Sequence, residues 1–178
     1  MFTWFSGLKP VRAIATGSRH RRITGDQFDN FSVDFTMENG IHVHSMCRQI
    51  NGCCGPISEF IQGSKGSWTS ETNEIKNLKG EVIWKYDDEV KKKYKEDNPT
   101  KLELIDWINH VRAGKHIEQV SDLEVSNMMA LMGRESAYTG QAVTWDAMAA
   151  STMDLTPPDL SLTGKMDMTK YIVPVPGK

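Results

Sequence analysis

The feature that most constrains the fold is an Asn39-Gly40 pair between two segments of alternating apolar and polar residues. Residues 31–37 and 41–45 alternate with the period of a β-strand, in which successive side chains point to opposite faces. Asn-Gly is a strong hairpin signal, because a two-residue type I′ turn needs positive φ at both positions. The predicted register pairs Met37 with His42, Phe35 with His44 and Phe31 with Arg48.

Further strand candidates lie on both sides of this hairpin. They are residues 10–16, 58–62, 67–72 and 81–86, and turns containing glycine separate the last three. This spacing is typical of an antiparallel meander, in which consecutive strands are joined by short turns.

The pattern changes to helical spacing after residue 100. Thr100-Lys101-Leu102-Glu103 and Ser121-Asp122-Leu123-Glu124 have the sequence of capping boxes, and Gly114 and Gly140 follow the two apolar stripes as stop signals. Thr144 begins a third, short helix. Strands followed by helices predict an α+β fold, with an open, mainly antiparallel sheet covered on one face by helices.

The length of 178 residues and a hydrophobic content of 39% fit one domain. We predict that residues 1–150 form the α+β domain and that residues 151–178 are an extended tail of it. This tail adds at most an edge strand, because its prolines exclude a central one.

The N-terminus has the sequence of a helix end. Phe2, Trp4 and Phe5 precede Gly7 without a capped helix start, so we expect a longer N-terminal portion before Met1.

Charge and hydropathy argue against nucleic acid and membrane partners. The net charge is -2, and the basic runs at residues 19–22 and 91–95 are short and closely followed by acidic residues. The longest apolar runs, such as residues 128–132, are too short to span a bilayer. Three cysteines exclude a complete disulfide framework. The compartment, cytoplasmic or periplasmic, stays open.

Motifs for phosphate and metal binding are weak or missing. The sequence has neither a G-x-G-x-x-G nor a Walker motif, and Gly63-Ser64-Lys65-Gly66 is better interpreted as a turn between strands. His42 and His44 form an H-x-H pair on one strand face, but their predicted neighbours, Met37 and Phe35, are poor ligands. We favour a packed or interfacial role for this pair. No catalytic, cofactor-binding or metal-binding residue is therefore assigned.

One group of polar residues lies at the predicted strand ends. Strand ends can converge on one mouth, and a mixture of guanidinium donors and carboxylate or amide acceptors suits a polyhydroxylated or carboxylate ligand. Solvated loop residues are the alternative interpretation. The predicted substrate-binding residues are Arg19, His20, Asp29, Asn30 and Arg48.

Several segments together resemble the C-terminal domain of the glucose-fructose oxidoreductase, inositol dehydrogenase and rhizopine-catabolism (Gfo/Idh/MocA) family. The resemblance covers nearly the whole chain in the correct order. The matching segments are Gly7-Leu8-Lys9-Pro10-Val11-Arg12-Ala13 with Gly17-Ser18-Arg19, Asp29-Asn30-Phe31-Ser32-Val33 leading to Glu38-Asn39-Gly40, Gly63-Ser64-Lys65-Gly66, Gly133-Arg134-Glu135-Ser136-Ala137-Tyr138-Thr139-Gly140 with Val143-Thr144-Trp145, and Val173-Pro174-Val175-Pro176-Gly177.

The resemblance implies a nicotinamide-dependent parent enzyme. In that family a Rossmann domain precedes this one and binds the nucleotide, and a lysine in E-K-P and a histidine in H-x-x-D carry out proton transfer. None of these motifs is in this sequence. The implied activity of the full-length parent is hydride transfer between NAD or NADP and a sugar or cyclitol. The resemblance also implies that this part of the parent is inactive alone and binds no cofactor. The C-terminal sheet of the family supplies substrate and subunit contacts.

Self-association is expected from the hairpin as well. In the predicted register Ile41 and Val43 make the face opposite Phe31, Val33, Phe35 and Met37 apolar, and soluble monomers seldom expose such a patch. We therefore expect a homodimer through the open sheet face, near the H-x-H strand. Two other functions remain: a domain of a nicotinamide-assisted glycosidase or lyase, and a free-standing carbohydrate-binding or scaffold domain.

Overall fold

The computed structural model describes residues 2–23, 25–156, 164 and 167–178. The chain divides into two compact units, one made of Met1–Gly55 with Gln119–Lys178 and the other of Pro56–Glu118. Each unit contains a four-stranded antiparallel sheet. Among the described residues, no helix is long and apolar enough to cross a membrane.

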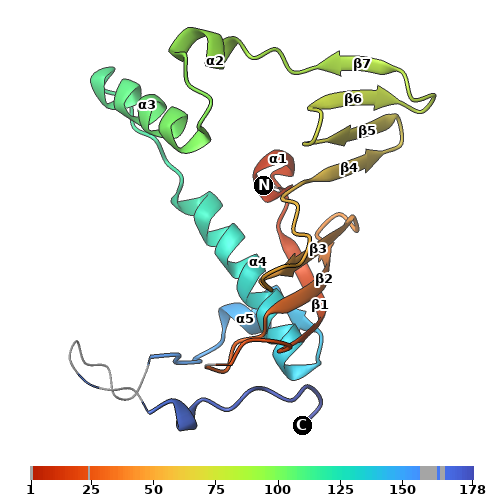
Figure 1. The fold of residues 1–178 in the computed structure, drawn as a ribbon, viewed down its shortest axis with the longest axis vertical. Helices are drawn as coiled ribbons and strands as arrows, with labels where there is room; N and C mark the ends of the chain where they lie inside the picture. The colour runs from red at the N-terminus through yellow and green to blue at the C-terminus, as the bar shows by residue number, and fades with distance from the viewer. Residues whose placement is uncertain (1, 24, 157–163, 165–166) are drawn as a thin grey trace. The chain divides into compact units, whose positions relative to one another are not determined.

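The first unit consists of a sheet with strand order β3-β2-β1-β8 and of helices from both ends of the chain (Figure 1). Its elements are α1 (Phe2–Ser6), β1 (Pro10–Ser18), β2 (Asn30–Met37), β3 (His42–Arg48), α4 (Val120–Thr139), β8 (Val143–Thr144), α5 (Trp145–Ala149) and the 3-10 helix η1 (Met168–Lys170).

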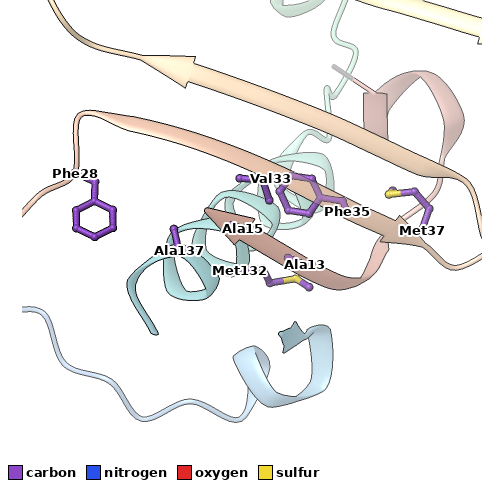
Figure 2. Close-up of a cluster of buried hydrophobic side chains, with 8 residues drawn as sticks. All are labelled: Ala13, Ala15, Phe28, Val33, Phe35, Met37, Met132 and Ala137. Carbon is purple, nitrogen blue, oxygen red and sulfur yellow. The ribbon is translucent and has the colours of Figure 1, made fainter. Parts of the chain in front are cut away.

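The core of this unit lies between α4 and one face of the sheet. Figure 2 shows the side chains of β1 and β2 beside those of α4. Gly133 lets the helix approach closely, because a Cβ at this position would lie 3.2 Å from Phe35 Cζ and from both methyl groups of Val33. The predicted fold, an antiparallel sheet with helices on one face, is confirmed. The buried apolar residues are Ala13, Ala15, Phe28, Val33, Phe35, Met37, Met132 and Ala137.

The β2–β3 turn differs from the prediction by one residue. The loop has three residues, Glu38 to Gly40; Met37 N donates to Ile41 O at 2.8 Å, and Gly40 has a φ of 82°. This matches a type I turn followed by a left-handed glycine, the commonest alternative to the predicted two-residue type I′ turn. The predicted register is therefore wrong. The observed pairs include Thr36 with His42, Phe35 with Val43, Asp34 with His44 and Asn30 with Arg48.

This one-residue shift changes the character of the opposite sheet face, since it moves each β3 side chain to the other side. Val43 packs on the core beside Phe35, so the predicted apolar patch containing Val43 is wrong. His42 Nδ1 instead lies 2.8 Å from Asp34 Oδ2 on the opposite face. The residues of this open face are exposed or half-buried; they include Arg12, Ile14, Thr16, Ser32, Asp34, His42, His44 and Met46.

Local sequence explains where the helices begin and end. Gly140 ends α4 in the left-handed conformation, and its N–H donates to Ser136 O at 2.9 Å, as predicted from the glycine stop. Thr144 caps α5 as predicted, because its hydroxyl accepts from Ala147 N. The predicted cap at Ser121 is wrong, since α4 begins at Val120 after a residue without a side-chain cap bond.

The second unit is a four-stranded meander followed by helices. A loop containing Gly52, Gly55 and Pro56 separates its strands from the first sheet, so the predicted strands form two sheets. Strand β6 was not predicted, because Ile75 is its single apolar residue. Asn98, and not the predicted Thr100, caps α3: Asn98 Oδ1 accepts from Thr100 N at 3.0 Å. The elements are β4 (Phe60–Gly63), β5 (Gly66–Thr69), β6 (Glu74–Asn77), β7 (Val82–Lys85), α2 (Glu89–Tyr94) and α3 (Pro99–Arg112).

The predicted tail after residue 150 has little regular structure where it is described. η1 is followed by residues 171–178 without a strand, and Gly177 N donates to Thr139 O at 2.9 Å, which attaches this segment to the end of α4. Pro157 and Pro158, used to predict an irregular tail, lie outside the described residues. The boundary predicted at residue 150 stays a prediction.

Candidate functional site

The carboxylate of Asp29 organises the loop between β1 and β2. Asp29 is 3% exposed and accepts hydrogen bonds from the backbone N–H groups of His20 at 2.9 Å, Arg21 at 2.6 Å and Arg22 at 2.9 Å. Burial alone would raise the pKa of this carboxyl. The N–H donors of Arg21, Arg22 and His20, with the Asn30 side chain, outweigh burial, so the pKa of Asp29 lies well below its ordinary range.

The other predicted site residues surround the same strand ends. Asn30 Nδ2 donates to Ser18 O at 3.0 Å, and Arg19 Nη1 donates to Gly25 O at 2.7 Å. Arg48, directly across from Asn30 in the sheet, donates to the carbonyl of Cys54. The predicted convergence of the ends of β1, β2 and β3 is thus present in the fold.

These contacts determine which predicted residues have side chains available to a ligand. The polar groups of Arg19, Asp29, Asn30 and Arg48 bind neighbouring loop or strand-end groups, while the His20 side chain is exposed. Asp29 and Arg19 therefore hold the loop in shape. The substrate contacts assigned to the five residues stay a prediction.

We expect Asp29→Asn to destabilise the loop and lower the urea midpoint of unfolding, because an amide cannot supply an ionised acceptor to several N–H groups. A depressed folded pKa contributes stability that is present above the unfolded value of 3.8 and is lost as pH falls through the folded pKa. The difference between the variant and the natural protein should thus be largest at neutral pH and shrink below pH 3.8.

Urea titrations at pH 7 and at pH 3 would measure this difference, with Asp26→Asn on the same loop as the matched control. An Asp29→Asn midpoint equal to that of the control at pH 7 would contradict the role assigned to this carboxylate.

A cavity of about 860 Å³ lies in the first unit between the sheet and the C-terminal half of α4. Helix α4 packs on β1 and β2, so the inner side of β3 remains open, and Ser45 and Cys47 are exposed there. Asp26 and Gln27 enter the cavity wall from the loop that Asp29 holds. The remaining lining residues are Phe28, Phe31, Val33, Phe35, Ala130, Gly133, Arg134, Glu135, Tyr138, Thr139, Met153, Leu155, Tyr171 and Pro174.

Aromatic rings form one wall of this cavity. The Tyr138 ring centroid lies 4.6 Å from that of Phe28, at an edge-to-face angle of 62°, and 6.2 Å from that of Phe31. The Tyr138 hydroxyl accepts from Phe28 N at 3.3 Å, which joins the end of α4 to the loop that precedes β2. Flat apolar walls with a few polar groups are typical of small-molecule sites.

Arg134 is the cationic side chain among the described lining residues, and its contacts with the neighbouring groups are long. Its Cζ lies 5.7 Å from the Tyr138 ring centroid, and its Nη2 lies 3.9 Å from Glu135 Oε2 and 3.5 Å from Met153 Sδ. Arg134 Nε is buried and has no hydrogen-bond partner within the described part of the chain. Arg134 was not among the predicted site residues, because it stands in a predicted helix beside apolar residues. The charged pair Arg134-Glu135 directly after Gly133 was the sequence signal that could have identified it.

The described residues do not fit a bound dinucleotide in the βαβ manner. Both sheets are antiparallel, whereas that mode places a pyrophosphate at the N-terminus of a helix following a parallel strand. The described residues also contain no group of three or more His, Cys, Asp or Glu side chains that could hold a metal ion.

Comparisons with known proteins find likeness in structure alone: no family model and no curated protein sequence matches the chain. A myo-inositol 2-dehydrogenase from Lactobacillus plantarum matches with a TM-score of 0.55 and 20% identity, over 80% of this chain and 44% of the other. An Agrobacterium radiobacter oxidoreductase, solved with NAD+, L-tartaric acid and magnesium, matches with a TM-score of 0.53 and 16% identity, over 79% and 44%.

A third solved structure, assigned as an oxidoreductase of Thermotoga maritima, has a TM-score of 0.59 and 22% identity, over 80% of this chain and 43% of that one. The chain thus spans less than half the length of each of these proteins. At these low identities the likeness in structure shows the fold alone. The chain has the α+β fold found in part of these oxidoreductases, which is the fold that its resemblance to the C-terminal domain of the Gfo/Idh/MocA family predicts.

Proposed function

We propose that this chain is the substrate-binding and oligomerisation domain of an NAD(P)-dependent oxidoreductase that acts on a sugar or cyclitol, and that it is inactive alone. The observation that carries the proposal is the likeness of its fold to part of three oxidoreductase chains, one of them a myo-inositol 2-dehydrogenase. The nicotinamide cofactor would supply hydride chemistry and would be bound outside this chain. The residues of this chain would bind and orient the substrate.

The cavity beside α4 supports a polyhydroxylated substrate. Its aromatic wall offers flat surfaces to the C–H faces of a ring, while Asp26, Gln27 and Glu135 offer acceptors for hydroxyl groups. Asp26 and Gln27 belong to the loop between β1 and β2 that the Asp29 carboxylate holds, so this loop would position both side chains. The tartrate bound by the Agrobacterium protein is also a polyhydroxylated molecule.

Calorimetric titration of the chain with myo-inositol, D-glucose, NAD and NADP tests the proposal. We expect weak binding of a polyol, with a Kd on the order of millimolar for a small ligand making a few hydrogen bonds, and no appreciable binding of either nucleotide. Micromolar affinity for NAD would contradict the proposal, since the nucleotide would then have its site within this chain.

We also propose that the chain forms a homodimer through the open face of the sheet β3-β2-β1-β8. An interface that mixes apolar and polar side chains is common between subunits. Ile14 and Met46 on this face are 46% and 75% exposed beside the Asp34–His42 pair. The proposal therefore rests on a face of mixed apolar and polar side chains, and no longer on the continuous apolar patch that the sequence predicted.

Sedimentation equilibrium at micromolar concentration should give a dimer, and Ile14→Glu should shift it to the monomer, because a charge buried between subunits is strongly unfavourable. Ile23→Glu, on an exposed loop position of the same unit, is the matched control and should leave the dimer intact. A monomer of 20.1 kDa for the unaltered chain would contradict the proposal.

A further inference from the structure

Among the residues that the structure describes, the guanidinium of Arg134 has no close anionic partner. Its side chain is 27% exposed, and the nearest carboxylate oxygen of these residues, on Glu135, is 3.9 Å away, beyond the usual hydrogen-bond range. Its contact with Met153 joins it to a thioether sulfur, which is a weak acceptor. A largely buried cation is costly unless it is paired with an acceptor.

Its neighbours limit how this cation can be neutralised from within the protein. The guanidinium carbon lies over the Tyr138 ring, 5.7 Å from its centroid, and a cation–π contact of this kind supplies no hydrogen-bond acceptor to the N–H groups of the guanidinium. Arg134 and Glu135 both line the cavity, so an acceptor bound there would meet the guanidinium at a wall that is partly screened from water.

We propose that the cavity takes a polyhydroxylated carboxylate, such as a uronic acid, and that Arg134 holds the carboxylate group. This inference rests on the proposed function, since it names the class of polyol that the cavity prefers. A carboxylate accepts two parallel N–H bonds from a guanidinium, which a neutral hydroxyl group cannot do. Glu135 and Asp26 would accept hydrogen bonds from the hydroxyl groups of the same ligand.

The charges of the cavity favour a carboxylate over a phosphate ester. The charged lining residues that the structure describes are one cation, Arg134, and two carboxylates, Asp26 and Glu135. A phosphate group carrying close to two negative charges would meet both carboxylates with a single cation to offset them. A carboxylate carries one charge and matches the fork of a single guanidinium.

The Cys47 thiol provides a probe, because it lines the cavity and is exposed. In a chain with Cys53→Ser and Cys54→Ser, the rate of alkylation by iodoacetamide reports on Cys47 alone. D-glucuronate and D-glucose form a matched pair that differs by a carboxylate in place of a hydroxymethyl group. We expect glucuronate to protect Cys47 at a concentration about tenfold lower than glucose, as expected for a charge-assisted pair.

Variants separate the role of Arg134 from that of the cavity. Arg134→Gln should abolish the preference for glucuronate and retain protection by glucose, whereas Arg12→Gln, on the open sheet face, should keep the preference. Glu135→Gln removes a negative charge beside Arg134 together with a hydroxyl acceptor that both sugars share, so it should widen the preference for glucuronate over glucose. This ratio provides a test that does not depend on the folding of the Arg134 variant.

The outcomes distinguish the inference from the proposed function. Equal protection by the two sugars, or better protection by glucose, would overturn the inference and leave a neutral polyol as the substrate class. Protection by neither sugar would overturn both the inference and the assignment of the cavity to the substrate.

Discussion

Gly133→Val is expected to lower the free energy of unfolding by about 3 kcal/mol, the upper part of the range for overpacked cores. A Cβ at this position would already lie 3.2 Å from Phe35 and Val33, and the two methyl groups of valine have no space between helix and sheet. A branched side chain cannot rotate away from the contact. Helix α4 would have to move outward from β2, which would expose apolar surface on both elements.

Denaturant unfolding of the variant measures this loss. The matched control is Ala130→Val, an exposed position on the same helix, where the lower helix propensity of valine should cost less than about 1 kcal/mol. If Gly133→Val cost no more than this control, helix and sheet would not approach each other as closely as the structure places them.

Ser136→Ala is expected to cost about 1–3 kcal/mol, since it leaves the buried N–H of Ala15 without its acceptor and the Gln141 carbonyl without its donor. Ser136 is fully buried; its hydroxyl accepts from Ala15 N on β1 at 2.8 Å and donates to Gln141 O at 2.6 Å. It thus supplies a side-chain acceptor to a strand N–H. Serine and alanine differ by one hydroxyl oxygen, so the substitution leaves no large cavity. The unsatisfied hydrogen bonds are therefore the main cause of the expected loss of stability.

The comparison is with Ser126→Ala on the same helix, whose hydroxyl lies 3.4 Å from that of Thr3 and which is itself exposed. That change should stay within about 0.5 kcal/mol, as is usual for surface substitutions. Similar midpoints for the two alanine variants would show that the bonds of Ser136 contribute nothing to the docking of α4 on the sheet.

These two positions also control the proposed binding site, because both lie on the segment of α4 that carries Arg134 and Tyr138. Gly133 sets the distance between helix and sheet, and Ser136 joins the helix to β1. A helix displaced at either residue would move the guanidinium and the aromatic wall together. Mild destabilisation at these positions should therefore weaken polyol binding as well as folding.

The sequence by itself was sufficient to predict the three long strands, helices α4 and α5, and the fold class of the first unit, but not β8 or the 3-10 helix. Alternation identified β2 and β3, and the glycine and threonine signals identified the end of α4 and the start of α5. Such features depend on neighbours within a few residues, so periodicity and capping chemistry are enough to predict them. The resemblance to an oxidoreductase domain added the fold, which three solved structures share.

The tertiary structure decided the features that depend on distant residues. The same Asn39-Gly40 pair fits two turns, and the three-residue loop puts Val43 on the core face beside Phe35. Asp29 became a loop anchor because it meets the backbone of residues 20–22. The cavity and its weakly paired Arg134 exist because α4 packs on β1 and β2 but leaves β3 open, and side-chain spacing along one chain contains no information about that packing.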